Sequence, residues 1–197
     1  MPQQNLKEFY SSLTKKELTK IRQYWEFGGI SQLNKSELIE VLVERIKARL
    51  EDWLKYQMPK NIEFLAEVIE KQKIEARVEV TPKVVLPPAL YNFYYRGILN
   101  LIDNEEETTV RIPADLAVEI DAIITKSEFK EKLKQNEEKI NFVRGSLAYY
   151  GALRGTQIKD FYDQYYKGEK SVEEFVDFLM LIEETYLSTY SIERYNY

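Results

Sequence analysis

Five basic residues near the start of the chain are the strongest candidates for binding chemistry. Lys15, Lys16 and Lys35 stand in the first turns of two expected helices, and Lys20 and Arg22 follow one turn after the first pair. The first turn of a helix exposes backbone N–H groups and the positive end of the helix dipole, so a cation there is unfavourable and an anion relieves the cost. The pattern predicts contacts to nucleic-acid phosphates; protein contact and simple solvation are the alternatives.

Tyrosines form a second group of candidates, because the chain contains 15 of them. A helix expected over residues 87–96 brings together aromatic rings that can stack on bases and a guanidinium that can bind phosphate. The segment Asp160–Tyr166 combines carboxylates with tyrosines, a composition that can imitate the charge of DNA. The candidate partner contacts are Tyr91, Tyr95, Arg96, Tyr162 and Tyr166. Helical spacing also fits tyrosines that lie in a core or an interface, and this alternative is favoured.

Catalytic chemistry has little support in the sequence. The chain contains no Cys and no His, which removes thiolate nucleophiles, imidazole acid–base catalysis and the usual zinc ligands. Two carboxylates with Mg²⁺ support phosphoryl chemistry, but carboxylates at helical spacing are typical of a solvated face. Such groups are Asp160 with Asp163, Glu173 with Glu174 and Asp177, and Glu183 with Glu184. We therefore expect no enzyme, no metal site and no cofactor.

Charge is unevenly distributed along a chain whose net charge is −5. Residues 1–60 carry 11 Lys and Arg against 8 Asp and Glu, whereas residues 61–197 carry 17 against 25. A polyanion is therefore expected to meet the N-terminal part. The first residues show no apolar run of a signal peptide, and no stretch approaches the roughly 20 apolar residues of a membrane span. These features favour a cytoplasmic protein without membrane contact.

Local start signals predict the helices that position the basic residues. Thr14–Glu17 and Asn34–Glu37 each place a hydroxyl or amide three residues before a Glu, which is the pattern of a capping box. The first helix is expected to run from Thr14 to the glycines at 28 and 29, and the second from Asn34 towards Pro59.

The segment of about residues 10–50 resembles the helix–extended loop–helix modules of the SAP domain and of the N-terminal region of transcription terminator Rho. The matching stretches are Leu13-Thr-Lys-Lys-Glu-Leu-Thr-Lys-Ile21 and Gly29-Ile-Ser-Gln-Leu-Asn-Lys-Ser-Glu-Leu-Ile39. Each contains the K-x-E-L pattern at the start of a helix. The sequence departs from the family in the loop, where Trp25 and Phe27 precede the glycines. The resemblance implies nucleic-acid binding, with DNA preferred to RNA.

The pattern of the remaining residues predicts two further regions, a middle one and a C-terminal one. Residues 59–126 predict helix, helix, hairpin and helix, with strands Ile98–Ile102 and Thr108–Ile112 and a further short strand at Arg77–Thr81. This order favours a winged-helix-like domain, whose acidic tip, Asp103–Glu107, indicates a protein contact. Helices are then expected at about 127–150, 156–167 and 171–187.

These patterns together predict a mainly α protein with a small β-hairpin. Its expected parts are a helix–loop–helix module at 1–58, a winged-helix-like domain at 59–126 and an acidic, Tyr-rich helical domain at 127–197. The predicted function is that of a non-enzymatic nucleic-acid-binding adaptor or regulator, of bacterial or phage type, whose acidic body binds a protein partner. The alternative is a protein-interaction or inhibitor protein that does not bind nucleic acid.

Overall fold

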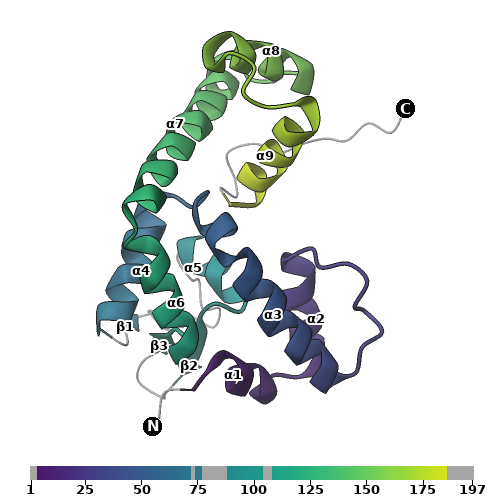
Figure 1. Cartoon of the computed structure of the whole chain (residues 1–197), viewed down its shortest axis with the longest axis vertical. Helices are drawn as coiled ribbons and strands as arrows, with labels where there is room; N and C mark the ends of the chain where they lie inside the picture. The colour runs from purple at the N-terminus through teal and green to yellow at the C-terminus, as the bar shows by residue number, and fades with distance from the viewer. Residues whose placement is uncertain (1–3, 72–73, 77–87, 104–107, 186–197) are drawn as a thin grey trace. The chain divides into compact units, whose positions relative to one another are not determined.

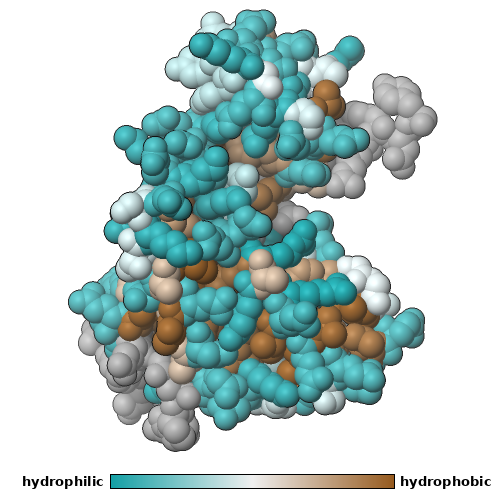
Figure 2. Space-filling model, viewed as in Figure 1, coloured by the Kyte–Doolittle hydropathy of each residue, from teal (hydrophilic) through white to brown (hydrophobic). Residues whose placement is uncertain are grey.

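A computed structural model of the chain describes residues 4–71, 74–76, 88–103 and 108–185 (Figure 1). These residues form nine helices and one small antiparallel sheet, which confirms a mainly α protein with a β-hairpin. They divide into two compact units: unit 1 comprises residues 1–54 and 60–130, and unit 2 comprises residues 55–59 and 131–197. None of the helices described is both long enough and apolar enough to cross a bilayer. On the face drawn in Figure 2, the surface is mainly hydrophilic.

Unit 1 opens with three helices, each of which begins at a capping box. They are α1 (Leu6–Ser12), α2 (Lys15–Tyr24) and α3 (Lys35–Leu54). The boxes join Asn5 to Glu8, Thr14 to Glu17, and Asn34 to Glu37. The helix starts predicted at Thr14 and Asn34 are confirmed. Helix α1 is absent from the predicted elements because seven residues are too few to show a helical period.

The remaining elements of unit 1 are three helices and the three strands of one sheet. In chain order they are α4 (Pro59–Lys71), β1 (Ile74–Ala76), α5 (Pro88–Tyr95), β2 (Asn100–Asp103), β3 (Thr108–Arg111) and α6 (Ala114–Ile124). Strand β3 is central and pairs antiparallel with both β1 and β2. The predicted hairpin is thus present, and a third strand joins it. The strand expected at Arg77–Thr81 and the loop residues 104–107 lie outside the described residues.

The first strand of the hairpin begins two residues later than predicted, because Ile98 and Leu99 complete the end of α5. Gly97 adopts a positive φ of 70°, which terminates the helix. The backbone N–H groups of Ile98 and Leu99 then both donate to the carbonyl of Phe93, at 2.9 and 3.4 Å. Both side chains are fully buried. Their apolar character reflects core packing and not strand pairing.

The predicted boundary near residue 58 does not separate compact units, which corrects the division into domains 1–58 and 59–126. Both segments contribute to one aromatic core: the ring of Phe93 in α5 packs edge-on against Trp53 in α3 at 5.6 Å. Trp53 in turn packs against Trp25, which follows α2, at 5.3 Å. Because these rings are all buried, the two segments share a single core.

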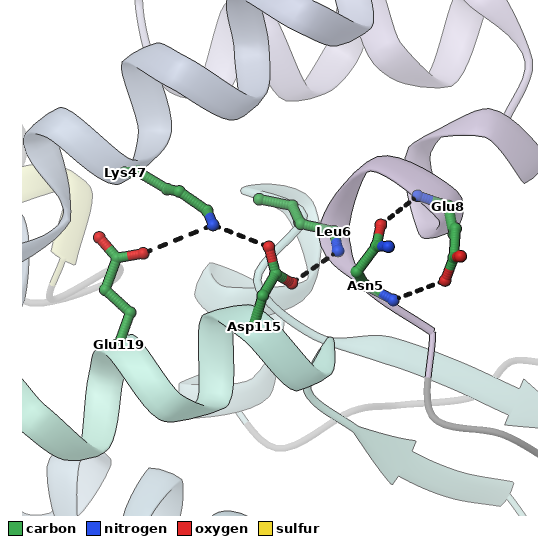
Figure 3. A network of polar contacts seen from close by, with 6 residues as sticks. All are labelled: Asn5, Leu6, Glu8, Lys47, Asp115 and Glu119. Carbon is green, nitrogen blue, oxygen red and sulfur yellow. Dashed lines mark hydrogen bonds and ion pairs between the residues drawn. The ribbon is translucent and has the colours of Figure 1, made fainter.

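A polar network holds α1 against α3 and α6 in unit 1 (Figure 3). Asp115 of α6 accepts the backbone N–H of Leu6 at 2.7 Å and the Lys47 ammonium at 2.7 Å. Glu119 lies 3.7 Å from the same ammonium. Partial burial raises the pKa of Asp115, but the hydrogen bonds from Lys47 and Leu6 outweigh it, and the net pKa lies below the usual value. The charged carboxylate is therefore the form that joins the three helices.

Unit 2 contains the three helices that the sequence predicts: α7 (Ser127–Tyr150), whose first turn belongs to unit 1, α8 (Gly155–Tyr166) and α9 (Val172–Thr185). Their start and end residues agree with the prediction to within about two positions. The buried cluster comprises Ile140, Val143, Ile158, Tyr162, Phe175, Phe178 and Leu179. The first turn of α9 is stabilised by the hydroxyl of Ser171, which accepts the backbone N–H of Glu174 at 3.2 Å.

Candidate nucleic-acid interface

Helix α2 presents lysines on its solvent-facing side. It carries four basic residues and one acidic residue, and Lys15, Lys16 and Lys20 are all exposed. Leu18 and Ile21 form the buried side of the helix. Because residues four apart lie on the same face of a helix, Lys16 and Lys20 form a row, which we call the lysine row. The structure thus keeps three of the five predicted basic contacts accessible on one helix.

The other two predicted basic contacts stabilise the backbone of unit 1. Arg22 is partly buried, and its Nη1 donates to the carbonyl of Phe27 at 2.9 Å. The Lys35 ammonium donates to the carbonyl of Ser11 in the last turn of α1, at 2.8 Å. A cation is favourable at that end of a helix, so Lys35 stabilises α1. Their first role is therefore structural.

The lysine row leads to a group of tyrosines that the fold assembles from α2 and α5. The ring of Tyr24 is nearly parallel to that of Tyr95, with centroids 4.9 Å apart and planes 13° apart. Tyr91 stacks on Tyr95 at 5.7 Å, also at 13°, and Tyr94 meets Tyr95 edge-on at 5.4 Å. We call Tyr24, Tyr91, Tyr94 and Tyr95 the tyrosine cluster. Two of its members remain open to solvent: Tyr24 is 44% exposed and Tyr94 is 38% exposed.

The tyrosine cluster also affects the ionisation of its central member. Partial burial and the neighbouring rings of Tyr24, Tyr91 and Tyr94 raise the pKa of Tyr95 above its ordinary value. Tyr95 is therefore neutral at physiological pH. A neutral Tyr95 ring carries no charge that would repel a phosphate.

A reciprocal pair of hydrogen bonds positions the cluster. The Arg96 guanidinium donates to the carbonyl of Tyr24, at the C-terminus of α2. The Trp25 indole N–H donates in return to the carbonyl of Arg96, at 2.8 Å. Residues 24 and 25 are thereby aligned with residues 95 and 96, which places the ring of Tyr24 beside that of Tyr95.

Arg96 itself lies in the core, which corrects its interpretation as a partner contact. It is only 3% exposed. Its guanidinium lies over the rings of Trp53 and Trp25, at 5.2 and 5.6 Å from their centroids. Such cation–π contacts stabilise a cation that burial would otherwise disfavour. The sequence prediction failed because it could not show that two tryptophans from other segments surround Arg96.

The two predicted partner contacts of unit 2 are also buried or partly buried. Tyr162 is fully buried and belongs to the core, so the alternative of a core residue holds for it. Burial, followed by the nearby charge of Glu169, raises its pKa well above the ordinary range. Tyr166 is partly buried and packs against Tyr162 at 4.6 Å. The exposed aromatic residues nearby are different ones: Tyr149 is 83% exposed, Tyr150 is 55% exposed and Tyr165 is 70% exposed.

Two of the predicted carboxylates of unit 2 serve local structure. Asp163 pairs with Lys159 one turn away in α8, and Glu174 accepts the backbone N–H of Ser171. Asp160 is exposed, as are Glu173 and Asp177 in α9. The side chains of Glu183 and Glu184 lie outside the part of the chain that is described. Among the residues that are described, no three acidic side chains gather in a way that could hold a metal ion.

Two further arginines lie beside the loop between α2 and α3, and the sequence did not indicate them as candidate contacts. The guanidinium groups of Arg45 and Arg49 are each 5.8 Å from the ring centroid of Phe27, and Arg45 donates to the carbonyl of Gly28 at 3.1 Å. Tyr24 was also missed. The four-residue spacing of Lys16, Lys20 and Tyr24 was the available signal, but nothing local indicates that Tyr24 meets α5.

Comparison of the chain with protein-family models, with curated proteins and with solved structures produced no match.

Proposed function

We propose that this protein is a non-enzymatic nucleic-acid-binding adaptor or regulator, and that unit 1 contacts the phosphate backbone through α2. The observation that carries the proposal is the exposed group of Lys15, Lys16 and Lys20 on one helix. Within α2 these cations outnumber the single acidic residue, Glu17. Exposed lysines attract the phosphate backbone of any sequence, since each contact releases counterions from the nucleic acid.

Three further features support the proposal. The N-terminal 60 residues carry an excess of basic residues, whereas the rest of the chain is acidic. Residues 10–50 resemble the SAP and Rho N-terminal modules in their two K-x-E-L motifs. In the structure, both motifs begin capped helices, α2 and α3. The winged-helix-like interpretation of residues 59–126 belongs to the same proposal, with the β2–β3 hairpin as its wing.

The test is fluorescence anisotropy with labelled DNA and RNA over a range of salt concentrations. About three phosphate contacts predict a slope of roughly −2 to −3 for the logarithm of the binding constant against the logarithm of salt concentration. The variant Lys15→Gln/Lys16→Gln/Lys20→Gln should bind weakly, with a nearly flat slope. Glutamine keeps a good helix propensity, so α2 should persist.

A matched control separates the local site from net charge. Lys130, Lys132 and Lys134 are exposed on α7 and can be changed to glutamine in the same way. That variant has the same net charge as the first but should bind nucleic acid like the parent protein. Equal losses in both variants would mean that only overall charge matters. No binding at low salt would refute the proposal.

A protein contact by unit 2 completes the adaptor and is also the basis of the second candidate function. Tyr149 and Tyr165 are 83% and 70% exposed, and aromatic residues are enriched in protein interfaces. If unit 1 binds no nucleic acid, the protein is an interaction or inhibitor protein. In a crosslinking experiment with cell extract, a partner specific to this surface should be captured by the parent protein and lost with Tyr149→Ala/Tyr165→Ala.

A further inference from the structure

We propose that unit 1 binds single-stranded nucleic acid, with phosphates along the lysine row and an unpaired base stacked on Tyr24. The inference rests on the nucleic-acid binding proposed above and specifies the form of nucleic acid. It is based on the tyrosine cluster, because phosphate binding by the lysines alone would not need aromatic rings beside them.

The lysine row and Tyr24 form one continuous track on α2. Lys16, Lys20 and Tyr24 are each four residues apart in α2, so about 6 Å along the helix axis separates each from the next. The track is therefore about 12 Å long. Successive phosphates in a stacked strand are about 3.4 Å apart along the axis, so the track matches about four nucleotides.

Glu17 is the acidic residue closest to this track in sequence. Its carboxylate accepts the backbone N–H and the hydroxyl of Thr14, both at 2.7 Å. These hydrogen bonds, together with the charges of Lys20 and Lys35, lower its pKa. Glu17 is therefore engaged in capping α2 and lies in a basic neighbourhood, which reduces its repulsion of a phosphate.

Tyr24 is prepared for stacking because its orientation is set before any ligand binds. Its ring is nearly parallel to that of Tyr95, while Arg96 holds the backbone carbonyl of Tyr24. A substantial part of the side chain nevertheless remains exposed. A ring held in this way loses little conformational entropy when a base stacks on it.

Stacking on an aromatic side chain distinguishes single strands from duplexes. A base in a duplex is stacked and paired within the helix, so its face is not accessible, whereas an unpaired base can rotate onto a tyrosine ring. Lysines alone bind both forms through phosphate. The combination of a basic track and an aromatic platform is the arrangement that favours single strands.

The experiment compares one unstructured twelve-nucleotide DNA, the RNA of the same sequence and the DNA duplex, each with a fluorescent label. It uses the full chain and two variants, Tyr24→Leu and Tyr24→Phe. Leucine keeps an apolar side chain but removes the ring, while phenylalanine keeps the ring. Tyr149→Leu, at an exposed position in unit 2, is the control for loss of a surface tyrosine. Circular dichroism verifies that each variant is folded.

Tighter binding of the DNA or RNA single strand than of the duplex is expected. Tyr24→Leu should weaken single-strand binding about tenfold, the effect of one lost base–aromatic stack, and leave duplex binding unchanged. Tyr24→Phe and Tyr149→Leu should bind like the parent protein. A 2-aminopurine base placed in the DNA strand should be quenched on binding to the parent protein but not to Tyr24→Leu.

Two results would overturn the inference while leaving the proposed function intact. One is duplex binding as tight as single-strand binding. The other is unchanged single-strand binding by Tyr24→Leu under conditions in which replacement of Lys15, Lys16 and Lys20 abolishes it. Absence of binding to all three probes at low salt would refute both proposals together.

Discussion

Replacement of Gly97 by alanine is expected to destabilise unit 1 strongly, because this glycine meets two separate constraints. Its φ is +70°, in the left-handed region, where an L-residue costs about 1–2 kcal/mol. A Cβ atom at this position would lie 2.7 Å from Oη of Tyr10 and 2.8 Å from Cδ1 of Ile21. Both side chains are buried, so relieving the overlap costs roughly 1–3 kcal/mol more. The expected loss is therefore roughly 2–5 kcal/mol.

Gly29 provides a matched control for the backbone strain. Its φ is +76°, but a Cβ atom there would meet nothing within 4 Å. Gly29→Ala should therefore lose only the strain, about 1–2 kcal/mol. The difference between the two variants measures the packing of Gly97 against α1 and α2.

Urea unfolding followed by tryptophan fluorescence is the appropriate assay. The chain has two tryptophans, Trp25 and Trp53, and both lie in unit 1. Their emission therefore reports on unit 1 alone, whereas circular dichroism reports on both units. If Gly97→Ala loses no more stability than Gly29→Ala, the close approach of α5 to α1 and α2 is not as described.

Three further predictions concern stability. Asp115→Asn removes the charge bound by Lys47 and should cost about 1–3 kcal/mol of unfolding free energy at pH 7. Because the pKa of Asp115 is lowered in the folded state, this stabilisation exists above about pH 4 and disappears as the pH falls through the folded pKa. The urea midpoints of parent and variant should therefore converge in acid. Trp25→Phe loses the indole donor to the buried Arg96 carbonyl and should cost about 1–3 kcal/mol in urea unfolding followed by circular dichroism, and an unchanged midpoint would contradict the reciprocal bonding. Tyr162→Phe should not lower the melting temperature of unit 2, since the buried hydroxyl donates to and accepts from no other group among the residues described; a clear drop would show that the hydroxyl is hydrogen-bonded.

The helices could be predicted from the sequence because their boundaries depend on local chemistry. Thr14 and Glu17 are three residues apart and cap each other whatever surrounds them, and the same holds for Asn34 with Glu37. The hairpin was predicted less accurately. Whether Ile98 and Leu99 extend a strand or complete α5 depends on Gly97, which has a positive φ and lies so close to Tyr10 and Ile21 that a Cβ atom would overlap them.

About half of the candidate site was also local. Lys15, Lys16 and Lys20 lie on the exposed face of one helix, which the apolar pattern of Leu18 and Ile21 already predicts. The tyrosine cluster was only partly predicted. Tyr91 and Tyr95 share a helix and could be grouped, but Tyr24, which stacks on Tyr95, lies 71 residues before it in the chain.

The sequence by itself thus determined the helices other than α1, the mainly α class and the lysines of α2, because capping and amphipathic periodicity act over a few residues. Only the tertiary structure decided that residues 1–54 and 60–126 belong to one compact unit, that Arg96 is buried, and that Tyr24 lies beside Tyr95. These outcomes depend on contacts between distant segments, chiefly the reciprocal hydrogen bonds of Arg96 with Tyr24 and of Trp25 with Arg96. Such contacts leave no periodic signal in the sequence.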